Sequence, residues 1–247
     1  MDADVIILAV LIAFFAATTQ SITGFGFALV YAPLLAVAWE VKPAVATTAT
    51  LSLVVNVLVL MQVRGHVTTP RLPGLYAGYL VGVGPGLLVL EYVSGDVLEV
   101  IVGAVVIVAT TALYFQPRID ASEDTLPIRM LAGAASGASA ASTGIGGPPV
   151  VLYMIGRETD VQRFRATLLA YFLPISIVTL ALFAAVGRID GDVLTVSAVS
   201  VPAILIGVVL GAWMRARISA DVFRRIVMGL LVGMSALLIA FTVFGIG

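Results

Sequence analysis

The chain has 247 residues, of which 61% are hydrophobic and only 11% are charged, and its net charge at pH 7 is −1. Soluble domains are about half apolar and about a quarter charged, so this composition excludes an ordinary soluble fold and indicates a membrane protein. The sequence contains no cysteine, which excludes disulfides, a thiolate nucleophile and a cysteine metal site.

Eight apolar segments follow one another along the chain, and most are near the length that spans a hydrocarbon core as a helix, about 20 residues. They fall at residues 5–38, 43–63, 72–90, 97–116, 128–156, 166–186, 193–214 and 226–245. Lipid offers no partner to free backbone groups, so we expect helices rather than open strands. The predicted fold class is an all-α polytopic membrane protein.

Two of these segments are too long for one ordinary crossing, and each is interrupted by glycine. The segment 5–38 contains "TGFG" at residues 23–26, and the segment 128–156 contains "TGIG" at residues 143–146, which is 120 residues later. Glycine weakens a helix, so each segment is expected to form a broken or re-entrant helical hairpin. Re-entrant hairpins and pairs of short crossings both remain open at this stage.

The repeated interruption belongs to a longer internal repeat. The same offset of 120 residues places Ala46-Thr47 on Ala166-Thr167, and Pro73 and Asp96 match Pro202 and Asp221 at offsets of 129 and 125. These matches keep their order along the chain, which favours a true repeat. We predict a first transmembrane repeat at 1–117, a cytoplasmic linker at 118–126 and a second repeat at 127–247, each with one hairpin and three transmembrane helices.

Positive charge is distributed unevenly between the two predicted sides of the membrane. If each overlong segment makes no net crossing, one side carries 11 of the 13 Lys and Arg residues, and only Lys42 and Arg188 lie opposite. If each crosses once, the split is 8 against 5. The positive-inside rule favours the first arrangement. Both termini are then outside, and the two repeats have inverted topology, as in many secondary transporters.

The two breaks have the properties of an anion site. Helices starting at Phe25 and Pro148 would present free N–H groups and the positive end of the helix dipole, and glycine allows close approach to the backbone. Hydroxyl and amide side chains nearby would add donors. The predicted substrate-binding residues are Gln20, Thr23, Gly24, Phe25, Gly26, Asn56, Ser142, Thr143, Gly144, Ile145, Gly146, Gly147 and Pro148.

Several of these features also have a purely structural interpretation. Glycines are common at packing faces of membrane helices, and those at Gly74, Gly78 and Gly82 are expected to serve that purpose, as are Gly207 with Gly211 and Gly229 with Gly233. Asn56, whose repeat counterpart is Ser176, could make an interhelical hydrogen bond instead of binding substrate. Arg163 and Arg165 are expected to be positive-inside residues, or to draw anions toward the cytoplasmic side.

The sequence shows no set of catalytic residues, so an enzyme is not expected. His66 is the single histidine, and no Asp, Glu, Lys or Arg is expected deep in a span. We expect no metal, no cofactor and no nucleic-acid partner. A site without charge but with positive helix ends suits a small anion better than a cation.

The breaks "TGFG" and "STGIGGPP", one in each half of a chain of 247 residues, resemble those of the TauE/SafE (sulfite exporter, TSUP) family of membrane transporters. The resemblance covers the whole chain in architecture, and its specificity rests on residues 23–26 and 142–149. It implies transport of a small sulfur-containing or organic anion, such as sulfite, sulfoacetate or a related organosulfonate.

The function predicted is that of a secondary transporter of a small anion in the cytoplasmic membrane, working by alternating access. The backbone N–H groups and hydroxyls at the two hairpin tips would hold the anion. Two alternatives stay open: an anion channel of the same fold, and a membrane scaffold protein that transports nothing. The expected partners are the anion and the lipid bilayer, and the glycine faces could also pack two copies into a homo-oligomer.

Overall fold

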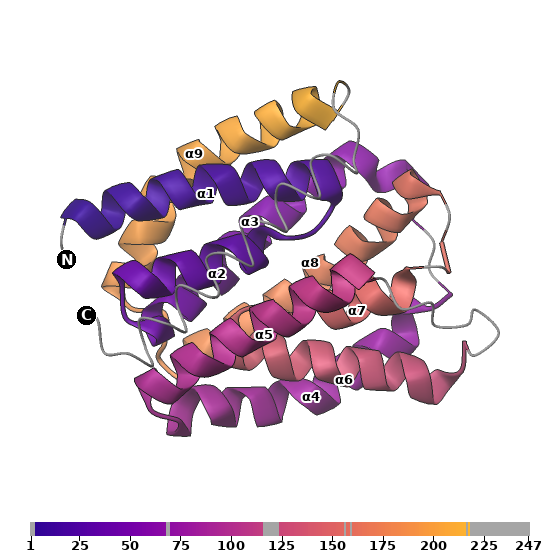
Figure 1. Cartoon of the computed structure of the whole chain (residues 1–247), viewed down its shortest axis with the longest axis horizontal. Coiled ribbons are helices and arrows are strands. Elements are labelled where there is room, and N and C mark those ends of the chain that lie inside the picture. Colours follow the sequence, from indigo (N-terminus) through magenta and orange to yellow (C-terminus); the bar gives the residue numbers. More distant parts are fainter. Residues whose placement is uncertain are drawn as a thin grey trace.

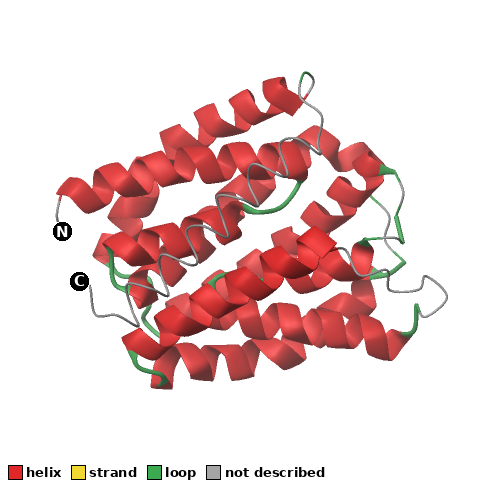
Figure 2. Cartoon of the chain, viewed as in Figure 1, coloured by secondary structure: helices red, strands yellow, loops and turns green. Residues whose placement is uncertain are grey.

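The computed structural model describes residues 3–67, 70–115, 124–155, 157–158, 160–215 and 217, and among these it shows nine α-helices, one short 3₁₀ helix and no strand (Figure 2). Six of the α-helices are long and apolar enough to cross a membrane. The prediction of an all-α polytopic membrane protein is therefore confirmed. The apolar segment predicted at 226–245 lies outside the described residues. The elements are α1 (Ala3–Thr23), α2 (Phe27–Ala38), α3 (Val41–Val63), η1 (Arg64–His66), α4 (Leu72–Tyr92), α5 (Gly95–Phe115), α6 (Leu126–Thr143), α7 (Gly147–Met154), α8 (Val161–Ala185) and α9 (Gly191–Arg215).

Both overlong segments are broken where the glycines interrupt them. Helix α2 begins at Phe27 and not at the predicted Phe25, because Gly24 and Gly26 have φ values of +88° and +105°, which no right-handed helix contains. Helix α7 begins at Gly147, one residue before the predicted Pro148, because Gly146 already has a φ of −89°. The breaks are thus confirmed, and the predicted helix starts are wrong by two residues and one residue.

The second helix of each broken segment is short. Helix α2 has 12 residues and α7 has 8. At a rise of 1.5 Å per residue they extend about 18 and 12 Å, whereas the hydrocarbon core is about 30 Å thick. Neither helix can span that core, which favours re-entrant hairpins over pairs of full crossings.

Two pairs of helices that are distant in sequence pack side by side along their lengths. Helix α1 lies against α9, and α4 lies against α6, while α3 and α8 contact each other between these pairs (Figure 1). Each pair therefore joins the first helix of one predicted repeat to the second full helix of the other. The central contact joins two helices that are counterparts in the predicted repeats.

The predicted glycine faces make these contacts close. A Cβ atom added at Gly78 or Gly82 of α4 would overlap the backbone of α6 at the carbonyls of Met130 and Ala134. On α9, a Cβ atom at Gly207 would lie 2.5 Å from the Phe14 carbonyl oxygen of α1. The packing role predicted for these residues is confirmed within one chain. Gly229 and Gly233 lie outside the described residues.

Helix α8 begins at Val161, five residues before the apolar segment predicted from 166. The Asp160 carboxylate accepts a hydrogen bond from the Arg163 backbone N–H at 2.8 Å, which satisfies a donor that has no partner within the helix. This early start places Arg163 and Arg165 on the helix itself. Their side chains consequently point in different directions, because residues two positions apart in an α-helix are separated by about 200° around its axis.

Candidate functional site

The two breaks line one cavity. Its volume is about 70 Å³, whereas a single water molecule needs about 10–15 Å³ of such volume, so the cavity has room for several waters or a small ion. None of the described residues that line it is charged. Nine predicted site residues are among them: Gln20, Phe25, Gly26, Asn56, Gly144, Ile145, Gly146, Gly147 and Pro148.

The threonines that precede the two breaks lie outside this lining and close the turns instead. Thr23 Oγ1 donates to the Thr19 carbonyl at 2.9 Å and accepts from the Phe25 N–H at 3.2 Å. Thr143 Oγ1 does the same at the second break, with the Ser139 carbonyl at 2.7 Å and the Ile145 N–H at 3.3 Å. Their hydroxyls thus hold the shape of the breaks.

Two further predicted residues, Gly24 and Ser142, also lie outside the lining of the cavity. Ser142 Oγ donates to the Ala138 carbonyl of its own helix at 2.8 Å. Gly24 has a φ of +88° and leaves no room for a side chain, because an added Cβ atom would lie 2.8 Å from Arg165 Cγ. Its contribution is to the shape of the first break.

A chain of hydrogen bonds crosses the cavity wall from the first break to α8. The Phe27 N–H donates to Gln20 Oε1 at 3.1 Å, and Gln20 Nε2 donates to Asn56 Oδ1 at 2.5 Å. Asn56 Nδ2 then donates to Ser176 Oγ at 2.9 Å, and Ser176 Oγ donates to the Phe172 carbonyl at 2.8 Å. The interhelical hydrogen bond considered for Asn56 is therefore present, and the same side chain also lines the cavity.

Several donors at the cavity still have capacity for a ligand. A primary amide carries two N–H groups, and Gln20 Nε2 and Asn56 Nδ2 each use only one in the described part of the chain. Helix α2 begins beside the cavity. The Phe27 N–H donates to Gln20 Oε1, whereas the N–H groups of Ala28 and Leu29 in the same first turn have no acceptor within the helix. The wall is therefore uncharged, and it is rich in donors at the positive end of a helix dipole.

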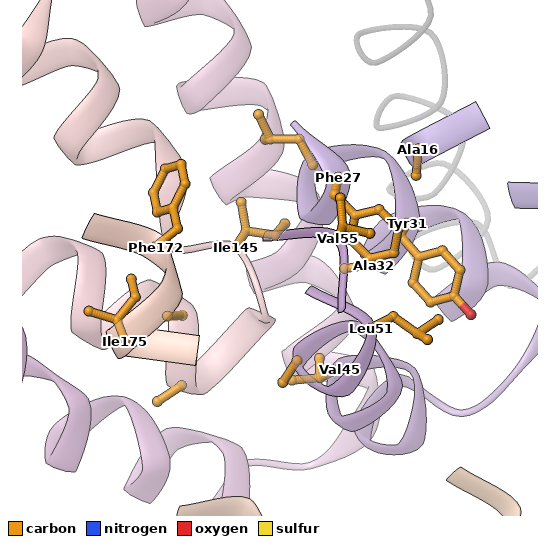
Figure 3. Close-up of a cluster of buried hydrophobic side chains, with 14 of the residues drawn as sticks. Ala16, Phe27, Tyr31, Ala32, Val45, Leu51, Val55, Ile145, Phe172 and Ile175 are labelled. Atoms are coloured by element: carbon orange, nitrogen blue, oxygen red, sulfur yellow. The ribbon is translucent and has the colours of Figure 1, made fainter. Parts of the chain in front are cut away.

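The predicted substrate-binding residues do not include the part of the wall that α8 and Ser52 supply. Phe172, Ile175, Ser176 and Thr179 line the cavity, and their spacing of three to four residues places them on one face of α8. Figure 3 shows Ile145 of the second break between Phe172 and Ile175 on one side and apolar residues of α2 and α3 on the other. Ser176, the polar counterpart of Asn56, was the available signal. The other lining residues of α8 lie within one helical turn of it on the same face.

The match with known proteins agrees with this architecture. Residues 9–238 match the family model described as "Sulfite exporter TauE/SafE". The chain belongs to the TauE/SafE family. A curated relative from Cupriavidus necator (strain H16 and its equivalents), named "Probable sulfite/organosulfonate exporter TauE", is 26% identical over 223 residues, which cover 88% of this chain and 87% of the relative. No solved structure matches the chain. The family resemblance predicted from the breaks is confirmed, and this TauE/SafE protein is a multi-pass membrane protein.

One end of α4 in this TauE/SafE protein carries an ion pair that holds the α8–α9 connection. Arg188 Nε lies 2.6 Å from Glu91 Oε1, and Arg188 Nη2 lies 2.8 Å from Glu91 Oε2. Lys42 Nζ donates to the Glu91 carbonyl oxygen at 3.1 Å. These arginine and lysine residues are the two predicted to lie on the outer side.

The opposite end of α4 carries a larger network around Asp124. The Asp124 carboxylate accepts from Arg71 Nε at 2.9 Å and from Arg129 Nε at 2.8 Å, and the Tyr153 hydroxyl donates to it at 2.5 Å. The hydrogen bond from Arg129 is the largest cause of a pKa of the Asp124 carboxyl well below its usual range, with further lowering by Tyr153 and Arg71. The network ties α4, the start of α6 and α7 together on the Arg-rich side.

Proposed function

We propose that this protein is a secondary transporter that exports sulfite or a related organosulfonate anion. The observation that carries the proposal is one uncharged, donor-rich cavity lined by both breaks and by Asn56 and Ser176. Membership of the TauE/SafE family supports a transport function, and the name of the Cupriavidus relative supports this substrate class. On the same grounds we propose a transporter and not an enzyme.

The anion would be bound by hydrogen bonds without a balancing positive side chain. Gln20 and Asn56 each offer an amide N–H, and Ser52 lines the cavity with a hydroxyl. The first turn of α2 offers backbone N–H groups, whereas that of α7 offers only the N–H of Gly147, because Pro148 and Pro149 have none. Hydrogen bonds to an ion are about twice as strong as those between neutral groups, so a few of them suffice for a transported ligand. A binding site without a fixed countercharge also releases its anion readily, as transport requires.

We further propose that the cavity lies at the centre of two inverted repeats, 1–117 and 127–247. The pairing of α1 with α9 and of α4 with α6, and the contact between α3 and α8, are the contacts that a two-fold relation between the repeats requires. Alternating access would then proceed by movement of one helix pair relative to the other. The ion pairs of Glu91 and Asp124 lie at opposite ends of α4, where such a movement of the helices would open and close the two sides of the protein.

The membrane proposed is the cytoplasmic membrane, with both termini outside. The distribution of Lys and Arg supports this orientation, because 11 of the 13 lie on one side when the overlong segments are re-entrant. Fusion of a reporter that is active only in the cytoplasm to the N-terminus tests it. Activity of that reporter would contradict the proposed orientation.

Transport in proteoliposomes tests the function. The purified chain in liposomes should show saturable sulfite flux, and it should accumulate sulfite against its gradient when a proton or sodium gradient is imposed. A channel would carry sulfite only down its electrochemical gradient, and a scaffold protein would carry none. Either of those outcomes would overturn the proposal of a secondary transporter.

A further inference from the structure

Two arginines beside the first break converge on one backbone carbonyl. Arg165, in the second turn of α8, is only 1% exposed, and Arg215 is partly buried at the end of α9. Arg165 Nη2 donates to the Ser21 carbonyl oxygen at 2.6 Å, and Arg215 Nη1 donates to the same oxygen at 3.1 Å. Neither arginine takes part in the ion pairs found among the described residues.

The Ser21 carbonyl explains only part of this arrangement. Ser21 lies in the last turn of α1, where carbonyl groups are free and the helix dipole favours a positive charge. Arg165 Nε and Nη1, however, are buried and have no hydrogen-bond partner in the part of the chain that the structure describes. Burying a guanidinium with unused donors lowers the stability of the fold, and a negatively charged hydrogen-bond acceptor would remove that cost.

The position of Arg165 connects it to the proposed transport site. Its side chain packs behind Gly24, since a Cβ atom at Gly24 would lie 2.8 Å from Arg165 Cγ. The next two residues, Phe25 and Gly26, line the cavity. The guanidinium group therefore lies behind the first break, on the side of the protein that carries most of the arginine residues.

We propose that Arg165 and Arg215 form a second anion site, which holds a small oxyanion from the water phase on the Arg-rich side of the first break. This site deepens the proposed function and rests on it, because it would collect the anion before the anion enters the cavity. Guanidinium groups suit this ligand, since their planar N–H donors match the oxygen atoms of sulfite, sulfate or a sulfonate. Arg165 is enclosed by protein, so a soluble anion fits the site better than a lipid headgroup.

The test compares melting temperatures of the intact chain in phosphatidylcholine nanodiscs, with sodium sulfate as the probe and sodium chloride at equal ionic strength as the reference. The variant is Arg165→Met, which removes the charge and keeps an unbranched side chain. The matched control is Arg163→Met, two residues earlier on the same helix, where the side chain is exposed. A ligand that binds the folded state raises its melting temperature.

The expected result is that sulfate reverses the order of the melting temperatures of wild type and Arg165→Met. Without sulfate, Arg165→Met should be at least as stable as wild type, because an unpaired buried charge has been removed. With sulfate, wild type should be the more stable of the two, and the shift caused by sulfate should fall by at least half in Arg165→Met but not in Arg163→Met. A lower stability of Arg165→Met at every sulfate concentration, with an unchanged shift, would show a purely structural arginine and overturn the proposal.

A second variant keeps the test decisive if Arg165→Met does not fold. Arg215→Gln should also reduce the sulfate shift, whereas Arg217→Gln should not, because Arg217 is exposed and lies over the Trp213 ring at 4.0 Å. An equal shift in Arg215→Gln and Arg217→Gln would contradict the proposed site.

A lipid arm separates a soluble anion from a headgroup. If phosphatidylglycerol in sulfate-free buffer stabilises wild type but not Arg165→Met, the occupant is a lipid headgroup, and the proposal of a soluble anion is wrong. Sulfite flux is measured independently, so its absence would overturn the proposed function, whereas the sulfate shift alone decides the second site.

Discussion

Asn56 Nδ2 donates to Ser176 Oγ at 2.9 Å, and the two residues are 120 positions apart in the sequence. The same offset separates Thr23 from Thr143, whose hydroxyls close the two breaks through equivalent hydrogen bonds. In the proposed pair of repeats, a residue that contacts its own counterpart lies close to the axis that relates the two repeats. The bond between α3 and α8 therefore supports an axis that passes through the wall of the cavity.

The first prediction concerns Asn56. Asn56→Ala removes the bonds to Gln20 and Ser176 and a second amide N–H of a side chain that lines the cavity. We expect sulfite flux in proteoliposomes to fall by about tenfold or more, since a hydrogen bond to a charged group contributes about 1.5–3 kcal/mol. Thr50→Val on the same helix is the matched control, because the Thr50 hydroxyl donates to the Ala46 carbonyl of its own helix and Thr50 lies outside the described lining of the cavity. Equal flux in the two variants would contradict a role for Asn56 in binding.

The second prediction concerns the glycines with positive φ at the two breaks. Gly24→Val and Gly144→Val should both abolish sulfite flux while the protein still inserts in the membrane, because a side chain at φ values of +88° and +75° is strained. Such strain costs about 1–3 kcal/mol at each position. The clash with Arg165 is closer than the clash with Thr48, at 2.8 Å against 3.3 Å, so Gly24→Val should lower the melting temperature more.

The control for both variants is Gly84→Val. Gly84 lies within α4, and an added Cβ atom would meet nothing within 4 Å. Flux and membrane insertion are measured together, the latter by extraction and size-exclusion chromatography. Normal flux in both Gly24→Val and Gly144→Val would exclude the two breaks as the transport site.

The third prediction separates packing glycines from free ones on a single helix. Gly82→Ala should strongly reduce the yield of folded protein, because its Cβ atom would overlap the Ala134 carbonyl of α6, and backbone cannot move aside as a flexible side chain can. Gly84→Ala, two residues later, should leave stability unchanged or slightly raised. Thermal melting of the two purified variants checks this. Similar melting temperatures would show that α4 and α6 do not pack as closely as described.

Much of this fold could be predicted from the sequence, because membrane helices are specified by local properties. The length of an apolar run and the glycines at 24, 26 and 144 were enough to predict the helices and both breaks. The choice of packing partner is not local. Nothing in the sequence indicates that the glycine face of α4 meets α6 while that of α9 meets α1, since each face would fit any close helix.

The candidate site was predictable to a similar degree. Backbone at the breaks and Asn56 were recognised because polar or helix-weakening residues stand out in an apolar segment, whereas Phe172 and Ile175 do not. The two arginines that open α8 could not be distinguished either. Arg163 is exposed and Arg165 is buried because the start of the helix at Val161 determines the direction of each side chain around the helix axis. That start depends on the Asp160 cap.

The fourth prediction concerns Asp124 and pH. The pKa of its carboxyl is lowered in the folded protein, chiefly by the hydrogen bond from Arg129. A lowered pKa means that the ionised carboxylate stabilises the fold above its unfolded pKa, which is about 3.9, and that this stabilisation is lost as pH falls through the lower folded value. Asp124→Asn removes the charge at every pH, so it should have a lower melting temperature than wild type at pH 7. The difference from wild type should stay constant down to about pH 4 and shrink only below that pH.

The control for Asp124→Asn is Asp96→Asn, because Asp96 is an exposed carboxylate in the first turn of α5 and takes part in none of the ion pairs among the described residues. Asp124 keeps 18% of its side-chain surface in solvent, and its two arginine partners keep 29% and 24%, so screening by salt should weaken the effect. Melting curves across pH at low and high salt measure both dependences. If the difference between wild type and Asp124→Asn at pH 7 were no larger than that for Asp96→Asn, the network would be a surface cluster without influence on how α4, α6 and α7 are held together.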